Sequence, residues 1–145
     1  MSPWRRSAVT LAPPVFVSIA DLDTKAPEKR DRARTLISEA LEKGNGAISW
    51  QVAQEFLNVA LHKFHKPLTA GEASDYLAQV LQPLWKVFPS PDLCQDALLI
   101  QRQTQYRFYD SLVIASATHA GAAILYSEDL QSGRTFGKTQ IVNPF

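Results

Sequence analysis

The sequence predicts an α/β domain with a central, mostly parallel sheet, and three observations lead to this prediction. The short apolar run VFVSIA, residues 15–20, is rich in β-branched side chains and is typical of a strand covered on both faces. The middle of the chain consists of long segments with helical periodicity. Two further strand-like runs, AAILYS (122–127) and TQIVNPF (139–145), follow near the end. Strands separated by helices are typical of parallel sheets, so this order favours the α/β class.

Length and composition indicate one folded domain. A chain of 145 residues can bury a core, and 46% hydrophobic residues is too high a share for a disordered chain. We expect residues 1–14 to form an irregular leader, followed by one domain over residues 15–145. The formal net charge is +1, so any nucleic-acid partner must be bound by a local basic patch.

The protein is expected in the cytoplasm. Its single cysteine, Cys94, cannot form an internal disulfide, which suits a reducing compartment. Two arginines and an apolar run near the N-terminus loosely imitate a secretory signal, but Pro13 and Pro14 interrupt the run and no small-residue cleavage site follows. No run approaches the ~20 apolar residues that cross a bilayer, so no membrane partner is expected.

Two helices are expected around the second strand. The segment PEKRDRARTLISEALEK (27–43) has a proline in its first turn and Gly44 as its stop. A turn and a short strand follow in GNGAIS (44–49), where Ser49 is placed to cap the next helix. That helix, WQVAQEFLNVALHKFHK (50–66), is strongly periodic and should end at Pro67.

Three further helical segments are expected before the last two strands. Thr69 can cap a helix over residues 70–88, which Pro83 should kink or split. A proline opens the next helix in SPDLCQDALLIQRQTQYR (90–107), and SLVIASATHAG (111–121) is a small, apolar helix with a glycine stop. Parallel sheets of this kind gather ligands at the carboxyl ends of their strands.

Three acids occur at that edge of the predicted sheet or beside apolar helical faces. Glu55 has Val52 three residues before it and Phe56 directly after it, so helical spacing places its carboxylate beside the apolar stripe. Asp110 opens the helix that ends the helical region, and it borders the buried face of that helix. Asp129 follows the strand AAILYS in the segment YSEDL.

Each acid also has an explanation that needs no ligand. Glu55 could extend to solvent, Asp110 could stabilise a helix N-terminus, and Asp129 could be a turn residue. If the three converge, their charges repel unless a divalent cation lies between them. Oxygen ligands without a Cys–His set favour Mg²⁺ or Mn²⁺ over zinc. Such a site suits phosphodiester hydrolysis.

Contact with RNA would come from basic and aromatic side chains near the acids. Arg102 and Arg107 precede Asp110, and further basic residues, Arg134 and Lys138, follow Asp129. Trp50 and Tyr109 flank the acids and could stack a base, although packing in the core or an interface is the stronger expectation.

Three longer segments carry a family resemblance. They are ISWQVAQEFLNVALHKF, YRFYDSLVIASATHAGAAILYSEDL and IVNPF. Together they resemble the PIN-domain family, and more narrowly the VapC-type toxin ribonucleases of bacterial toxin–antitoxin modules. The resemblance runs from about residue 15 to the end of the chain.

The resemblance implies a three-layer α/β/α sandwich and a metal pocket lined by acids, with Mg²⁺- or Mn²⁺-dependent cleavage of RNA. It also implies a homodimer and a cognate antitoxin whose tail blocks the pocket. By position, Glu55, Asp110 and Asp129 match the second, third and fourth acids of the family. Ser127 matches the family's hydroxyl residue two positions before the last acid.

The first acid of the family is where this chain departs from the pattern. The family carries it at the end of the first strand, in an Asp-Thr-Asn or Asp-Ser-Asn motif, and Ser18 stands there instead. Two substitutes remain open: Asp21, if the strand slips by three residues, or Asp23 followed by Thr24. We favour Asp21 as an imperfect fourth metal ligand beside the other three acids.

The missing carboxylate leaves two functions open. The first is a metal-dependent endoribonuclease that lacks one ligand of its metal. The alternative is a catalytically impaired PIN domain that dimerises and binds an antitoxin, because the loss of a ligand should weaken metal binding.

Overall fold

Strand β1 (Val15–Val17) lies inside the sheet, with a parallel neighbour on each side. The structure is a computed structural model that describes residues 13–18 and 26–145. Within these residues the sheet has six strands in the order β3-β2-β1-β4-β6-β5. Every neighbouring pair is parallel except β5 with β6. The predicted α/β class with a mostly parallel sheet is confirmed.

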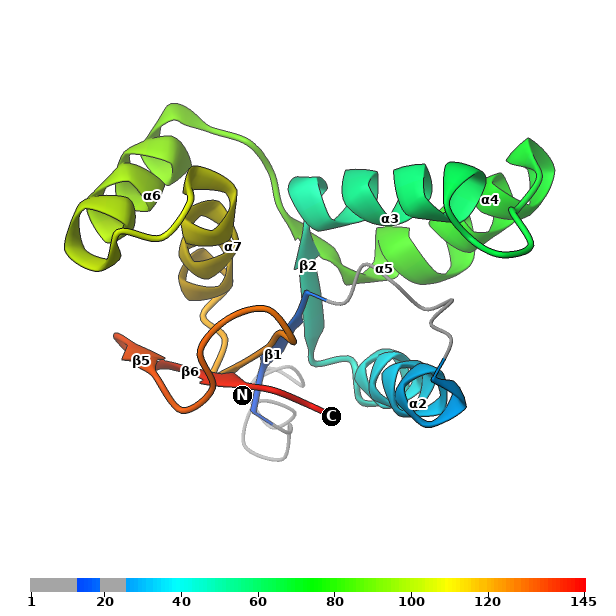
Figure 1. The fold of residues 1–145 in the computed structure, drawn as a ribbon, viewed down its shortest axis with the longest axis horizontal. Coiled ribbons are helices and arrows are strands. Elements are labelled where there is room, and N and C mark those ends of the chain that lie inside the picture. Colours follow the sequence, from blue (N-terminus) through cyan, green and yellow to red (C-terminus); the bar gives the residue numbers. More distant parts are fainter. Residues whose placement is uncertain (1–12, 19–25) are drawn as a thin grey trace, which may run out of the picture.

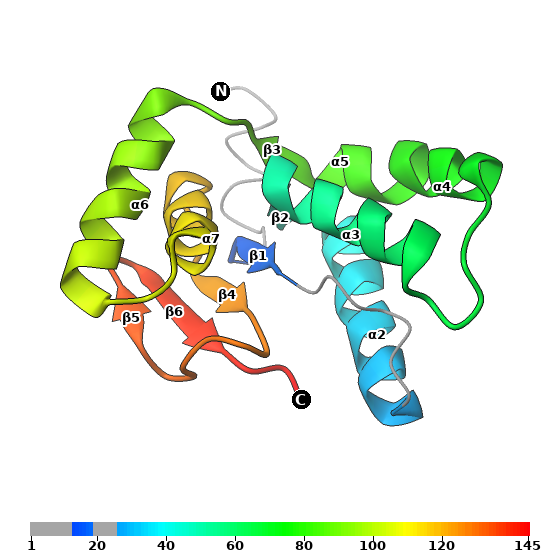
Figure 2. The same ribbon diagram turned by 45° about the horizontal axis from the view of Figure 1, so that its top comes forward.

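Helices flank both sides of the sheet. Strands β1 and β2 lie between α7 on one side and α2 on the other, and the turned view shows the same arrangement (Figures 1 and 2). This is the three-layer arrangement that the sequence led us to expect. The remaining elements, in chain order, are α2 (Pro27–Lys43), β2 (Gly46–Ser49), α3 (Trp50–His62), α4 (Ala70–Tyr76), the π-helical turn η1 (Leu77–Leu81), α5 (Gln82–Leu84), β3 (Trp85–Val87), α6 (Pro91–Thr104), α7 (Phe108–His119), β4 (Ile124–Tyr126), β5 (Thr135–Phe136) and β6 (Thr139–Val142).

The core is centred on the inner strands and on α7. Its largest fully buried apolar side chains are Phe16 on β1, Ile114 on α7, Leu125 on β4 and Ile141 on β6. Helix α7 has buried residues over most of its length, which explains why its sequence is small and apolar throughout. The burial of α7 holds its first turn, which carries Asp110, in a defined place.

The first half of the chain follows the sequence-based prediction closely. Helix α2 covers the predicted residues 27–43, and Gly44 ends it in the left-handed conformation at φ 67°. The backbone N–H of Val52 donates to Ser49 Oγ at 3.3 Å, which confirms the predicted cap of α3. Helix α3 ends at His62 rather than at Lys66, and Phe64 then packs edge-on against Phe56.

The predicted helix over residues 70–88 is the largest difference. It consists of α4, the turn η1 and the short α5, and its last residues form strand β3. Pro83 lies in α5, directly after the π-helical turn, so the helix is interrupted there as predicted. The strand was missed because Trp85 and Val87 continue the apolar pattern of the helix, whereas pairing with β2 decides their conformation.

Helix α7 also begins earlier than predicted. It starts at Phe108 rather than after Asp110, so Asp110 lies inside the first turn. The chain reaches this start through Gln105, which ends α6 in the left-handed conformation at φ 63°. No glycine marks this end of the helix, so the sequence offered little signal for it.

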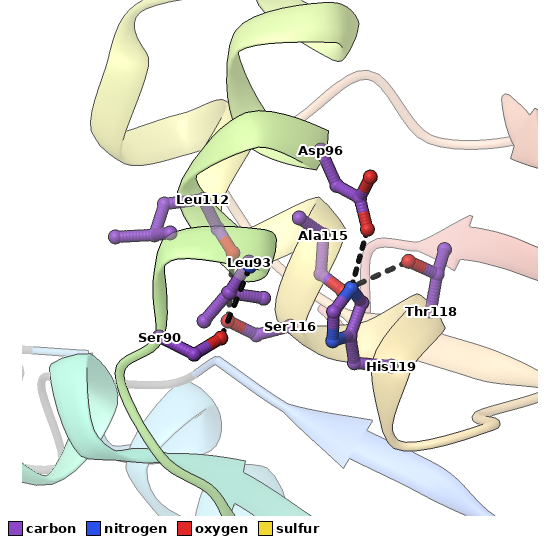
Figure 3. Close-up of polar contacts among 8 residues, drawn as sticks. All are labelled: Ser90, Leu93, Asp96, Leu112, Ala115, Ser116, Thr118 and His119. Atoms are coloured by element: carbon purple, nitrogen blue, oxygen red, sulfur yellow. Dashed lines mark hydrogen bonds and ion pairs between the residues drawn. The ribbon is translucent and has the colours of Figure 1, made fainter.

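A polar contact joins the C-terminal end of α7 to α6. Figure 3 shows His119 Nε2 of α7, which contacts Asp96 Oδ2 of α6 at 2.5 Å. His119 is the last residue of α7. The same view shows Ser90, which caps the start of α6 by accepting from the backbone N–H of Leu93 at 3.1 Å.

The packing of β2 against α2 and α5 is tightest at Gly46. A Cβ atom at this position would lie 2.6 Å from Ala40 Cβ and 2.7 Å from Leu84 Cδ2. We expect Gly46→Ala to lower the free energy of unfolding by about 1–3 kcal/mol, because the added methyl group overpacks a full space. Urea denaturation followed by circular dichroism measures this effect.

Gly71 provides the matched control. It lies in α4, and the only described contact of an added Cβ there is Thr69 Oγ1 at 3.9 Å. Gly71→Ala should leave stability unchanged or raise it by up to about 1 kcal/mol, because alanine is the better helix former. Equal stability of the Gly46→Ala variant and the wild type would show that β2 and its helices have room to separate.

Candidate active site

The carboxyl ends of β1, β2 and β4 form one edge of the sheet. These three strands are adjacent and parallel, so their carboxyl ends point the same way. Helix α3 leaves this edge directly after β2, and α7 returns its first turn to it because α7 precedes β4. Asp110 on the first turn of α7 and Glu55, which follows the first turn of α3, are thereby brought to the same side of the molecule.

Gln51 links these two first turns. Its side-chain Nε2 donates to Glu55 Oε1 at 3.1 Å and to the backbone oxygen of Tyr109 at 3.2 Å. Gln51 is only 7% exposed, so the link lies inside the protein rather than on its surface. Because Tyr109 directly precedes Asp110, this one amide ties Glu55 to the turn of α7 that carries Asp110.

The two acids differ in how they meet solvent. Asp110 is half-buried and lies in the first turn of α7, where the helix dipole favours a negative charge. Glu55 is exposed although its neighbours Val52 and Phe56 are buried, so its carboxylate extends to solvent past the apolar stripe. These positions agree with the explanations that need no ligand: Glu55 extends to solvent, and Asp110 stabilises a helix N-terminus. Neither explanation accounts for the contact between Gln51 and Glu55.

Asp129 lies in the loop that follows β4. It is exposed, whereas Ser127 in the same loop is buried and its backbone N–H donates to Val142 O at 3.1 Å. The neighbouring Glu128 forms an ion pair with Lys29 of α2. The loop is thus anchored on both sides, and it holds Asp129 at the carboxyl end of β4.

Ser18 occupies the end of β1. Val17 pairs with Tyr126, and the backbone N–H of Ser18 donates to Tyr126 O at 2.9 Å. This register puts Ser18 level with Ser127, so the adjacent ends of β1 and β4 carry hydroxyl groups rather than carboxylates. The two substitutes for the missing acid, Asp21 and Asp23, lie outside the described residues.

A divalent metal ion fits the chemistry of these donors but not their arrangement. Carboxylate and hydroxyl oxygens are the ligands that Mg²⁺ and Mn²⁺ prefer. In residues 13–18 and 26–145, however, no group of three or more His, Cys, Asp and Glu side chains could hold a metal ion. Within the described residues, Glu55, Asp110 and Asp129 therefore do not come together as one metal site.

Gln51 is the residue that sequence reasoning missed. It stands four residues before Glu55 on α3, a spacing at which an amide and a carboxylate meet on one helix face. That spacing was a usable signal. The contact of Gln51 with Tyr109 on α7 was not predictable, because it depends on how the two helices pack.

The fold defines the class of this protein. It is an α/β protein that carries acidic residues near the carboxyl-terminal edge of a parallel sheet. The PIN domain family matches residues 15–135 of the chain. The chain belongs to the PIN domain family. No curated protein matches the chain in sequence.

Membership supports a coarse assignment of activity. The PIN domain is a nuclease-type fold, and its members are generally nucleases that use divalent metal ions and bind nucleic acid. The described residues include no helix that is both long and apolar enough to span a membrane.

Proposed function

We propose that this protein is a Mg²⁺- or Mn²⁺-dependent endoribonuclease, the toxin component of a toxin–antitoxin module of the VapC type. The observation that carries the proposal is the buried amide of Gln51, which links Glu55 to the first turn of α7, the turn that carries Asp110. The proposed metal ligands are Glu55, Asp110 and Asp129, with Asp21 as the fourth, and the side chains of the three described acids would have to move together to hold the ion. Family membership supports the nuclease class.

Basic side chains that stand near the acids in the sequence support RNA as the substrate. Arg102 and Arg107 are exposed at the end of α6 and the start of α7. Arg134 is held differently: its guanidinium lies over the rings of Tyr106 and Phe136, at 5.3 Å and 5.1 Å from the ring centroids. Arg102 and Arg107 are therefore the better candidates for phosphate contacts, and binding should weaken as salt rises.

The proposal also includes a homodimer. Leu98 and Leu99 are exposed on α6, and large apolar side chains that neighbour each other on a surface favour contact with another protein chain. The polar residues around them are suited to the rim of such a contact.

An RNA cleavage assay tests the proposed activity. The purified protein, incubated with a labelled structured RNA, should produce discrete fragments when Mn²⁺ or Mg²⁺ is present and none when EDTA is present. Fragments that persist in EDTA would exclude metal-dependent cleavage. The absence of fragments with either metal, from a protein that still binds RNA, would favour the second function below.

The second candidate function is a catalytically impaired PIN domain that binds an antitoxin. Ser18 at the end of β1 favours it, because a serine supplies no negative charge for a metal ion. A groove between α2, α3 and the segment from α4 to η1 supplies a surface for such a partner. Its volume is about 540 Å³.

The groove combines an apolar floor with a cationic border. Phe56, Phe64 and Tyr76 form an aromatic cluster in its floor, where Phe56 and Tyr76 stack at 4.6 Å. Burial raises the pKa of Tyr76 to about 12, so its hydroxyl stays neutral against the floor. The basic residues of the groove are Arg30, Arg34 and Lys66.

Charge complementarity indicates the chemistry of the partner. The Nε of Arg30 is buried without a hydrogen-bond acceptor among the described residues, although Asp31 Oδ1 lies 4.0 Å away as an ion-pair partner. A segment with apolar residues on one face and acids beside them would fill the floor and neutralise the cations. We propose that the antitoxin presents such a segment.

Reversing one charge in the groove should weaken this complex. We expect Arg34→Glu to reduce the affinity for the antitoxin by about 10-fold or more, since it places like charges across the contact. The protein encoded by the reading frame upstream of this gene is the candidate antitoxin, and calorimetry measures its binding. Lys86→Glu, the same charge change on β3 outside the groove, should bind normally. Equal binding by both variants would remove the groove from the proposal.

A further inference from the structure

We propose that a second cavity, beside the acids, binds one unpaired nucleobase of the RNA. This inference rests on the proposed function and deepens it, because it names the part of the substrate that the protein holds. The cavity has a volume of about 200 Å³ and lies between the first turns of α3 and α7 and the connection from β3 to α6. The residues that carry the argument are Trp50, Gln51, Phe88, Phe108 and Tyr109.

Aromatic side chains gather at this cavity and remain exposed. Tyr109 is 67% exposed, Phe88 64% and Trp50 39%. Neighbouring rings hold two of them in place: Phe88 stacks on Trp85 at 5.6 Å, and Tyr109 meets Phe108 edge-on at 5.7 Å. Exposed aromatic rings around an apolar hollow are the arrangement on which single-stranded nucleic acid stacks its bases.

Gln51 supplies a polar feature that the aromatic residues lack. Its side chain lines the cavity, and its Oε1 is buried without a hydrogen-bond donor in the described part of the chain. Its Nε2 is already engaged by Glu55 and by Tyr109 O, so the amide is fixed behind the apolar wall of the cavity and its oxygen is covered. A buried acceptor without a donor is unfavourable, and a base that displaces this cover carries N–H groups that can donate to the amide oxygen.

The position of Gln51 explains what base binding would achieve. The same side chain lines the cavity and contacts Glu55, while Tyr109 lines the cavity and directly precedes Asp110. A base held in the cavity would bring its phosphate to the edge of the sheet where the acids lie. Arg107, the exposed residue directly before α7, is adjacent in sequence to the cavity residue Phe108, so its cation is available for that phosphate. This charge favours RNA over a second protein chain as the occupant.

The test measures binding in EDTA, so that it does not depend on cleavage. The probe is a short unstructured RNA that carries 2-aminopurine, whose emission falls when the base stacks on an aromatic ring. The wild type should quench the emission and bind the single strand more tightly than the duplex of the same sequence. Tyr109→Ala should lose the quenching and bind about 5- to 150-fold more weakly, the range that one base–aromatic stack supplies. Tyr109→Phe keeps the ring and should behave like the wild type.

Control variants separate the alternatives. Phe145→Ala removes a partly exposed aromatic ring outside the cavity and should leave RNA binding unchanged. Equal RNA affinity of Tyr109→Ala and the wild type overturns the inference. A change in molecular mass on light scattering without a change in RNA affinity also overturns it, and would assign the cavity to a contact between two copies of the chain. Tyr109-dependent quenching without any metal-dependent cleavage would support base binding while contradicting the proposed nuclease.

Discussion

Replacing Asp110 with asparagine is expected to reduce metal-dependent RNA cleavage by at least about 100-fold. Asparagine keeps the shape of the side chain and removes its charge, so the substitution tests the charge alone. Changes to residues that only support metal ligands already cost about 10–100-fold, and the loss of a ligand should cost more. Initial cleavage rates of wild type and variant, measured at saturating Mn²⁺, give the ratio directly.

The fold should survive this substitution. Asp110 lies at the start of α7, and losing a favourable charge at a helix N-terminus costs only about 0.3–1 kcal/mol. Asp75→Asn, at an exposed acid of α4, is the matched control and should cleave RNA as the wild type does. Cleavage at the wild-type rate by the Asp110→Asn variant would show that Asp110 is not part of the active site.

Replacing Phe16 with alanine is expected to lower the free energy of unfolding by about 3–5 kcal/mol. Phe16 is fully buried in β1, between β2 and β4, and truncating a buried phenylalanine loses its burial and leaves a cavity. β1 has three residues, so few other side chains attach this strand to the core. Urea denaturation of the variant and the wild type measures the difference.

Phe145→Ala provides the comparison at an exposed position. Its ring is partly exposed and contacts Lys29 Nζ at 5.6 Å from the ring centroid. Because little apolar surface is lost there, the change should stay below about 1 kcal/mol. If Phe16→Ala and Phe145→Ala lowered the stability by similar amounts, the Phe16 side chain of β1 would contribute little to the core.

The sequence alone determined the elements whose signals are local. Helix α2 was predicted at its observed bounds because a proline opens it and Gly44 ends it, and Ser49 was predicted as a cap from its place before α3. These signals act within a few residues of the chain. A local signal also placed Asp110 near the start of α7, although that start was predicted three residues late.

The contacts that join distant segments were decided by the tertiary structure. Trp85 and Val87 continue a helical pattern, and only pairing with β2 makes them a strand. Gln51 looks like an ordinary helical residue until the packing of α3 against α7 brings Tyr109 O to its amide. The register of β1 against β4 likewise decides that Ser18 stands level with Ser127. Local propensity could identify the acids and their helices, but it could not say which side chains meet, because that depends on burial and hydrogen bonding between parts far apart in the chain.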